Sequence, residues 1–173
     1  PESMDAGAAC AIPTQYGTAY YCAEEMVRLH EGDHVLIQAA AGGVGTALVQ
    51  LAKNRGCVIY GTAGSEKKLD YLRELDVDHP INYRTTDYEE YINKVRGDEG
   101  LDVVFDSLGG DDVKKARRLI TKGGGRVVCY GAASRSGKKG GIFSTLKLAW
   151  GFGIMSPIPL LMNSQAIIGV NML

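Results

Sequence analysis

This sequence of 173 residues has almost no excess of charge of either sign. It also has few closely spaced cysteines and few uninterrupted apolar runs. Its 19 basic and 20 acidic residues leave a net charge of −1, which argues against a nucleic-acid partner, because such proteins need a basic surface. The four cysteines form no Cys-x-x-Cys pair, and no histidine stands at ligand spacing. We therefore predict neither a metal site nor a disulfide framework, as is typical of a cytoplasmic protein.

The most apolar stretch, residues 142–162, is too interrupted to cross a membrane. Lys147, the glycine- and serine-containing segment 151–156, and the prolines Pro157 and Pro159 break it up. An apolar flap or a partner-facing surface is the better interpretation. The chain opens on Pro1 and on acidic and small residues, without the pattern of a signal peptide. This start indicates a single domain excised from a longer protein.

The most informative motif is the glycine turn, residues 39–45, with the sequence Ala-Ala-Ala-Gly-Gly-Val-Gly. In the fingerprint Gly-x-Gly-x-x-Gly, Gly42 and Gly45 take the second and third glycine positions and Ala40 replaces the first. A β-branched run precedes the turn and an apolar helical pattern follows it. Such a turn offers free N–H groups and a helix dipole to a pyrophosphate. The alternative is a glycine turn that binds no nucleotide.

Hydrophobic periodicity predicts an α/β fold, a Rossmann-type doubly wound sheet of six parallel strands. The strands are expected at 34–39, 57–62, 80–83, 101–106, 125–130 and 167–172. Helices are expected after the glycine turn and at 65–75, 86–96 and 111–120, with Thr86 and Glu89 forming a capping box. Residues 1–30 form leading helices broken at Pro13 and Gly17, 142–165 an apolar helical insertion, and 166–173 the last strand.

The end of the second predicted strand carries no acidic residue. Residues 61–65 read Gly-Thr-Ala-Gly-Ser, where an NAD-preferring enzyme would place a carboxylate for the ribose hydroxyls. Lys67 and Lys68 follow, so a 2′-phosphate would meet no like charge and could gain a charge-assisted contact. We therefore predict NADPH as the cofactor. Exposed lysines are common in a first helical turn, and Ser65 also suits an N-cap, so both residues have ordinary structural interpretations as well.

The fourth and fifth predicted strands end in small residues. Segments 105–110 and 129–132 place Ser107, Gly131 and backbone groups where a ribose of the cofactor could rest. Asp106 is interpreted as a hydrogen-bonded carboxylate at a strand end rather than as a catalytic group. Tyr83 ends the third strand and either approaches the adenosine 2′-phosphate or packs on its neighbours.

Several segments together resemble the medium-chain dehydrogenase/reductase superfamily. They are the glycine turn, Gln50-Leu51-Ala52-Lys53, Gly61-Thr62, Ile81-Asn82-Tyr83-Arg84, Asp106-Ser107-Leu108-Gly109-Gly110 and Gly125-Arg126-Val127-Val128. Within the superfamily, the chain is similar to the zinc-free quinone oxidoreductase branch. Segments 79–83 and 85–88 and the apolar stretch resemble the homologues of the vesicle amine transport protein most.

This resemblance implies a set of cofactor-binding residues. The residues that match the family's pyrophosphate cradle are Gly42, Gly43, Val44 and Gly45. The residues that match the surroundings of the 2′-phosphate are Gly61, Thr62, Ser65, Lys68 and Tyr83. The residues that match the nicotinamide end are Thr18, Tyr130, Gly131 and Ala132. Family members also carry a catalytic domain, formed by sequence before Pro1 and after Leu173. The resemblance therefore implies that this chain binds NADPH but transfers hydride weakly or not at all by itself.

For the longer protein, the resemblance implies hydride transfer from NADPH to a quinone or enone. That reaction requires orientation and exclusion of water rather than a protein acid or base, so no catalytic residue is named. The last strand is expected to pair across a two-fold axis in a homodimer. Two alternatives are a non-catalytic NADPH-binding protein that associates with membranes or partners through 142–162, and a methyltransferase. The second is disfavoured, because it needs an acid near residues 61–63.

Overall fold

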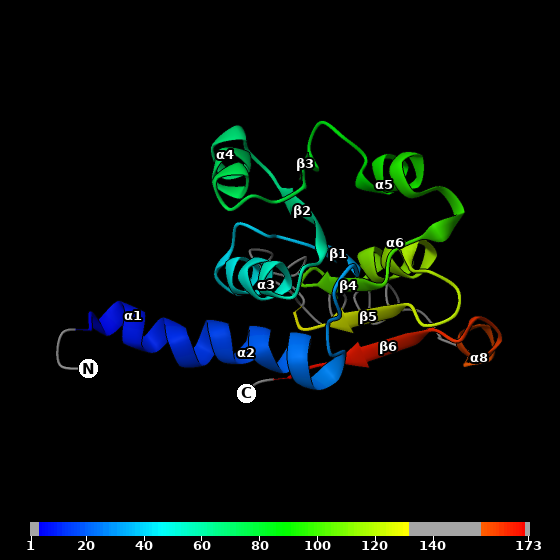
Figure 1. The fold of residues 1–173 in the computed structure, drawn as a ribbon, viewed down its shortest axis with the longest axis horizontal. Helices are drawn as coiled ribbons and strands as arrows, with labels where there is room; N and C mark the ends of the chain where they lie inside the picture. Colours follow the sequence, from blue (N-terminus) through cyan, green and yellow to red (C-terminus); the bar gives the residue numbers. More distant parts are fainter. Residues whose placement is uncertain (1–3, 132–156, 172–173) are drawn as a thin grey trace, which may run out of the picture.

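The computed structural model describes residues 4–131 and 157–171, which form one sheet of six parallel strands in the order β3-β2-β1-β4-β5-β6. The strands are β1 (His34–Ile37), β2 (Val58–Ala63), β3 (His79–Asn82), β4 (Val103–Asp106), β5 (Arg126–Cys129) and β6 (Ala166–Gly169). The chain winds outward from β1 to β3, then returns to β4 and winds the other way (Figure 1). This arrangement confirms the doubly wound Rossmann-type sheet, and the observed strands differ from the predicted ones mainly at their ends.

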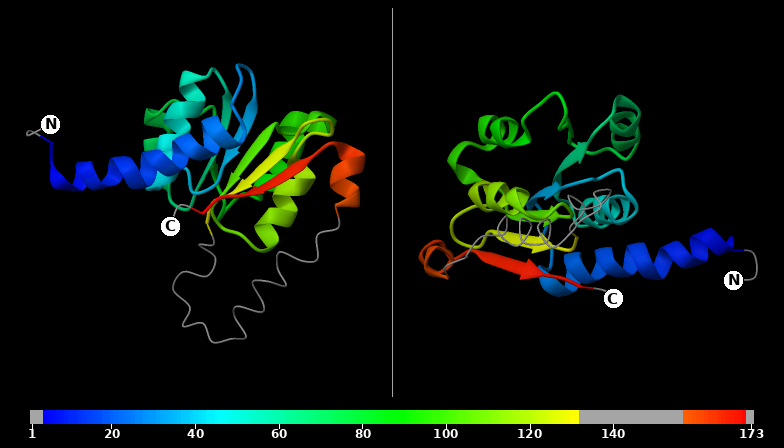
Figure 2. Two further views of the ribbon diagram at one scale, coloured as in Figure 1. Left: turned by 90° about the horizontal axis from the view of Figure 1, so that it is seen from below. Right: turned by 180° about the vertical axis from the view of Figure 1, so that it is seen from behind.

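Helices cover both faces of the sheet, as Figure 2 shows. The covering helices are α3 (Gly43–Asn54), α4 (Glu66–Glu74), α5 (Tyr88–Arg96) and α6 (Asp111–Leu119). The 3₁₀ turn η3 (Gly97–Glu99) follows α5, and α8 (Ile158–Asn163) precedes β6. Because successive side chains of a strand point to opposite faces, Ile37 and Phe105 pack with α3 and α4, whereas Leu36 and Val104 pack with α5 and α6. The α8 helix lies in the predicted insertion, whose residues up to 156 fall outside the described ranges.

The predicted break of the leading segment at Pro13 and Gly17 is wrong. Helical turns run without interruption through α1 (Ala6–Ala11), η1 (Ile12–Tyr16), α2 (Gly17–Tyr20) and η2 (Tyr21–Met26), where η1 and η2 are π-helical. The chain changes to wider π turns at Ile12, and the N–H of Gly17 donates to the carbonyl of Ile12. Pro13 therefore lies in the first turn of the π segment, where its missing N–H does not end the helix. This leading helix packs against α3 (Figure 1).

The predicted capping box at the start of α5 is also wrong. The N-cap is Asp87, whose carboxylate accepts hydrogen bonds from the N–H groups of Glu89 (2.8 Å) and Glu90 (3.4 Å). The side chain of Glu89 instead pairs with Arg118 on α6, at 2.6 and 2.8 Å. An aspartate is a strong N-cap, because its charge also favours the positive end of the helix dipole.

In the described ranges, none of the helices combines the length and hydropathy that a membrane span requires.

Candidate functional site

The turn after β1 is fixed to the two neighbouring strands. The N–H of Gln38 donates to the carbonyl of Phe105 (3.1 Å), and the N–H of Ala40 donates to the carbonyl of Thr62 (3.0 Å). Ala39, between them, has a positive φ of 51°, and its N–H donates to the Thr62 hydroxyl at 3.2 Å. The glycine turn therefore starts from a fixed position at the carboxyl edge of the sheet, where α/β proteins bind ligands.

The first turn of α3 leaves backbone donors unpaired. Gly42 is its N-cap in an extended conformation, and no side chain caps this end. The N–H of Gly42 donates to the carbonyl of Ala39 at 2.8 Å. In the described part of the chain, the N–H groups of Gly43, Val44 and Gly45 make no hydrogen bond. These donors, at the positive end of a helix of 12 residues, form an anion site that suits a pyrophosphate.

Gly45 allows α3 to approach the turn closely. A Cβ atom on Gly45 would overlap the carbonyl oxygen of Ala39 and lie 2.8 Å from the Cα of Ala40. Both neighbours are backbone groups, which cannot rotate away. The third glycine of the fingerprint is therefore required for packing of the helix against the turn rather than for contact with a ligand.

A small cleft of about 80 Å³ opens beside the turn. Its lining residues are Ala39, Ala41, Gly42, Thr62, Ala63, Gly64, Lys68 and Tyr83. The structure thus brings together Gly42, Thr62, Lys68 and Tyr83, which the sequence had placed on four different segments. The lining also includes Ala39, Ala41, Ala63 and Gly64. They lie in the two segments that the sequence singled out but were not named as site residues, because a small side chain gives no signal of its own.

Lys68 is the one charged residue among those described as lining the cleft. Its side chain is exposed, and its ammonium makes no ion pair or hydrogen bond within the described ranges. Ser65 stands at the N-cap of α4, but its hydroxyl makes no capping bond there. Gly61 is buried beneath the cleft, where a Cβ would meet Ala40, Leu72 and Val77. The cleft therefore offers one free positive charge and no carboxylate.

Asp106, at the end of β4, is fully buried and holds the loop that follows it. One carboxylate oxygen accepts hydrogen bonds from the N–H groups of Leu108 (2.6 Å) and Gly109 (3.0 Å). The other oxygen makes no hydrogen bond with any described residue. Burial raises the pKa of Asp106, although the two backbone donors oppose that rise. The two backbone hydrogen bonds fit the interpretation of Asp106 as a hydrogen-bonded carboxylate at a strand end. The second oxygen, which has no partner, was not expected from the sequence.

Ser107 and Tyr130 place two unsatisfied hydroxyl groups near the ends of β4 and β5. Within the described ranges, both oxygens are buried without a well-formed hydrogen bond. Burial raises the pKa of the Tyr130 phenol, and the nearby Ser107 hydroxyl opposes that rise. A Cβ on Gly131 would lie 2.7 Å from the carbonyl oxygen of Ser107, so the two loops are in contact. Buried polar groups normally have hydrogen-bond partners, and the described residues do not supply them for these two hydroxyl groups.

The remaining predicted site residues lie elsewhere. Thr18 is buried on the leading helix, and its hydroxyl donates to the carbonyl of Thr14 at 2.6 Å. Ala132 lies outside the described residues. Among the residues that are described, no group of three or more histidine, cysteine or acidic side chains is placed to hold a metal ion.

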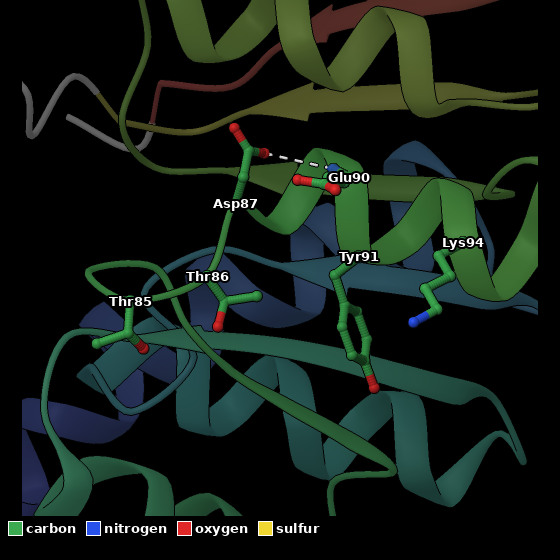
Figure 3. Close-up of a pocket in the computed structure, with 6 residues that line it drawn as sticks. All are labelled: Thr85, Thr86, Asp87, Glu90, Tyr91 and Lys94. Carbon is green, nitrogen blue, oxygen red and sulfur yellow. Dashed lines mark hydrogen bonds between the residues drawn. The ribbon is translucent and has the colours of Figure 1, made fainter.

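A larger groove of about 290 Å³ lies along the start of α5 (Figure 3). It is lined by Thr85, Thr86, Asp87, Glu90, Tyr91 and Lys94. Asp87 is already used as the helix cap, and the phenol of Tyr91 lies 3.1 Å from a ring nitrogen of His79. Carboxylates flank the groove, so it does not suit a phosphate. The chemistry of the lining, rather than volume, identifies the smaller cleft as the candidate site.

Comparison with known proteins identifies the family of the chain. The profile of a family described as zinc-binding dehydrogenase matches residues 43–172. The chain is 37% identical over 174 residues to the synaptic vesicle membrane protein VAT-1 homolog of Homo sapiens, covering 99% of this chain and 44% of that protein. It is 35% identical over 143 residues to a 2-haloacrylate reductase of Burkholderia sp, covering 77% and 43%. The chain thus spans less than half the length of these curated relatives.

Solved structures extend the match to three dimensions. The nucleotide-binding subdomain of the enoylreductase domain of PpsC from Mycobacterium tuberculosis superposes with a TM-score of 0.76 at 29% identity, covering 93% of this chain and 81% of that one. The CurK enoyl reductase gives 0.75 at 31% identity, covering 98% and 46%. This chain therefore belongs to the zinc-binding dehydrogenase family of the medium-chain dehydrogenase/reductase superfamily and forms its NAD(P)-binding domain.

Proposed function

We propose that this chain is the NADPH-binding domain of an oxidoreductase that reduces a quinone or an enone. The observation that carries the proposal is the cleft beside the glycine turn, which contains an unpaired lysine and no carboxylate. A 2′-phosphate there gains a charge-assisted contact with Lys68. In an NAD-preferring site, a carboxylate would stand at the end of β2 and repel that phosphate.

The other groups near the cleft supply neutral hydrogen-bonding partners. The hydroxyls of Ser65 and Tyr83 are exposed and make no hydrogen bond within the described ranges. The unpaired N–H groups at the start of α3 hold the pyrophosphate. The opposite end of the cofactor lies against Ser107, Tyr130 and Gly131. There it supplies hydrogen-bond partners for the buried hydroxyl groups of Ser107 and Tyr130. This chain thus binds and orients the dinucleotide along the carboxyl edge of the sheet.

The proposed class of hydride acceptor is based on the activities of similar proteins. NADPH supplies the hydride. Electron-poor carbon–carbon double bonds and quinones can accept it without a general acid supplied by a protein residue. A 2-haloacrylate reductase and enoyl reductases stand among the relatives. The motifs in the glycine turn and in segments 81–84, 106–110 and 125–128 favour the zinc-free quinone oxidoreductase branch. The protein is a homodimer in this proposal, in which β6, an edge strand of the sheet, pairs with β6 of a second copy of the chain.

Calorimetric titration with NADPH and NADH tests the cofactor assignment. We expect NADPH to bind about tenfold or more tightly than NADH, since a hydrogen bond to a charged group contributes roughly 1.5–3 kcal/mol. The variant Lys68→Glu should lose this preference. Lys122→Glu is the matched control, because it makes the same charge change at an exposed position before β5, outside the cleft. Equal affinities of the unaltered chain for the two cofactors would overturn the assignment.

A second candidate is a non-catalytic NADPH-binding protein that associates with a partner or a membrane. It is favoured by the exposed apolar face of α8, where Ile158, Leu161 and Met162 are 65%, 79% and 76% exposed. Quinone turnover by the longer protein that contains this domain distinguishes the two candidates. Turnover supports the reductase, and NADPH binding without turnover supports the second candidate.

A further inference from the structure

The side chain of Gln15 lies against the first residue of α3. Gln15 belongs to η1 of the leading helix, which packs against α3 (Figure 1). A Cβ atom on Gly43 would lie 2.5 Å from both Nε2 and Oε1 of Gln15. The carboxamide therefore occupies the space that a side chain at position 43 would fill. Because Cα–Cβ bonds tilt towards the N-terminus of a helix, this space adjoins the unpaired N–H groups at the start of α3.

The Gln15 carboxamide has hydrogen-bonding capacity that the protein does not use. Gln15 is half-buried, and within the described ranges its side chain makes no hydrogen bond. A primary amide offers two donors and an acceptor, and such groups normally find partners when they leave bulk water. The neighbouring groups on α3 are N–H donors, with which the Nε2 donors cannot pair. The complementary partner of Nε2 is therefore an acceptor from outside the chain, whereas Oε1 can face the N–H donors.

Contacts on both sides hold Gln15 in this place. The phenol of Tyr16 donates to the side-chain oxygen of Gln50 on α3 at 2.7 Å. Thr14 and Thr18 are joined by a hydrogen bond of 2.6 Å from the Thr18 hydroxyl to the Thr14 carbonyl. The backbone that carries Gln15 is therefore held near α3, so only the rotamer freedom of the Gln15 side chain remains to be lost when a ligand binds.

We propose that Gln15 is a cofactor-binding residue whose Nε2 donates a hydrogen bond to a pyrophosphate oxygen held at the start of α3. The inference rests on the proposed function, because it needs a dinucleotide on the glycine turn. It adds a side-chain donor from the leading helix to a site otherwise built from backbone groups. The pyrophosphate is common to NADPH and NADH, so Gln15 contributes equally to both, whereas Lys68 discriminates between them.

The test measures dissociation constants of the full chain and of Gln15→Ala and Gln15→Glu for NADPH, NADH and adenosine, which lacks the pyrophosphate. For Gln15→Ala we expect both dinucleotides to bind about tenfold more weakly, with their affinity ratio unchanged, and adenosine to be unaffected. Gln15→Glu should bind them more weakly still, and the additional loss should shrink at high salt. Asn54→Asp, the same amide-to-carboxylate change at the other end of α3, is the control and should retain affinity. Unchanged melting temperatures exclude a folding defect.

The outcomes separate the two proposals. If the unaltered chain binds dinucleotide and Gln15→Ala binds it equally well or more tightly, Gln15 is a bystander or an obstacle and this inference is wrong. If NADPH and NADH bind equally but both weaken in Gln15→Ala, the inference holds and the NADPH assignment fails. If the unaltered chain binds neither cofactor at millimolar concentration, the proposed function fails and the role of Gln15 fails with it.

Discussion

The hydroxyl oxygen of Thr62 accepts a hydrogen bond from the backbone N–H of Ala39 at 3.2 Å. The carbonyl of Thr62 accepts a second one from Ala40 at 3.0 Å. One residue at the end of β2 therefore holds two consecutive N–H groups of the glycine turn. Because Thr62 also lines the cleft, the turn and the cleft of the candidate site share a single support.

Removal of the Thr62 hydroxyl should loosen the turn. In Thr62→Val the N–H of Ala39 loses its acceptor, the hydroxyl of the buried Thr62, so we expect a loss of about 1 kcal/mol in the free energy of unfolding. The specific readout is hydrogen exchange of the Ala39 amide, which should become faster in Thr62→Val and stay slow in Thr62→Ser. Equal exchange in the two variants would show that this hydrogen bond does not hold the turn.

Substitution of two glycines should have opposite effects. Gly45→Ala forces a Cβ into the backbone of Ala39 and Ala40, and we expect a loss of roughly 1–3 kcal/mol in unfolding free energy. Gly17→Ala adds a Cβ in open space at a helical position, so it should stabilise the chain by about 0.5–1 kcal/mol. Urea denaturation of both variants measures the difference. A destabilised Gly17→Ala variant would contradict the continuous leading helix.

The buried Asp106 predicts a pH-dependent stability. The pKa of Asp106 is raised in the folded chain, so the folded state favours the protonated carboxyl. The contribution of Asp106 to folding stability is therefore greatest below the pKa that it has in the unfolded chain. This contribution is lost as the pH rises through its pKa in the folded chain. Asp106→Asn keeps the acceptor for Leu108 and Gly109 without the charge. We expect its stability relative to the unaltered chain to increase between pH 4 and pH 7.

Exposed Asp98 provides the control for that experiment, since Asp98→Asn makes the same change on the surface. Its stability difference from the unaltered chain should vary little over the same pH range. Denaturation curves at several pH values measure both variants. A pH-independent difference for Asp106→Asn would show that the folded chain does not favour the protonated carboxyl.

Tyr130→Phe should separate stability from binding. The Tyr130 hydroxyl is buried without a good partner, so its removal should leave the stability of the free chain equal or higher. NADPH should bind roughly threefold to tenfold more weakly, because the cofactor loses one hydrogen bond. Tyr60→Phe is the comparison: its hydroxyl lies 3.3 Å from a His34 nitrogen, away from the cleft, so it should cost stability without changing affinity. Equal affinity of Tyr130→Phe and the unaltered chain would contradict this role.

The four cysteines should differ in reactivity. Burial raises the pKa of Cys57 and of Cys129 to about 12 and that of Cys22 to about 11, so their thiolates are scarce at neutral pH. Cys10 is exposed on the leading helix. Iodoacetamide at pH 8 should therefore modify Cys10 first in the folded chain and all four cysteines in urea, as mass spectrometry can measure. Rapid modification of Cys22 in the folded chain would show that the leading helix opens.

Patterns within one element predicted most of the fold. The β-branched residues before the glycine turn and the helical periodicity after it gave β1 and α3, and β2 was predicted at 57–62 against Val58–Ala63 observed. The two errors were also local. Pro13 was accommodated by a π turn, and Asp87 competed successfully with Thr86 for the cap of α5. Propensity rules identify the residues that suit a break or a cap but do not decide between neighbours.

By itself, the sequence determined the alternation of strands and helices, the winding of the sheet and the position of the anion-binding turn, because these follow from periodicity and from glycines close together in the chain. Only the tertiary structure decided which residues line the cleft, that Asp106 and Tyr130 are buried with unsatisfied oxygens, and that Gln15 lies against Gly43. These relationships join segments that are distant in sequence. They depend on how the leading helix and the loops pack on the sheet, which no local pattern specifies.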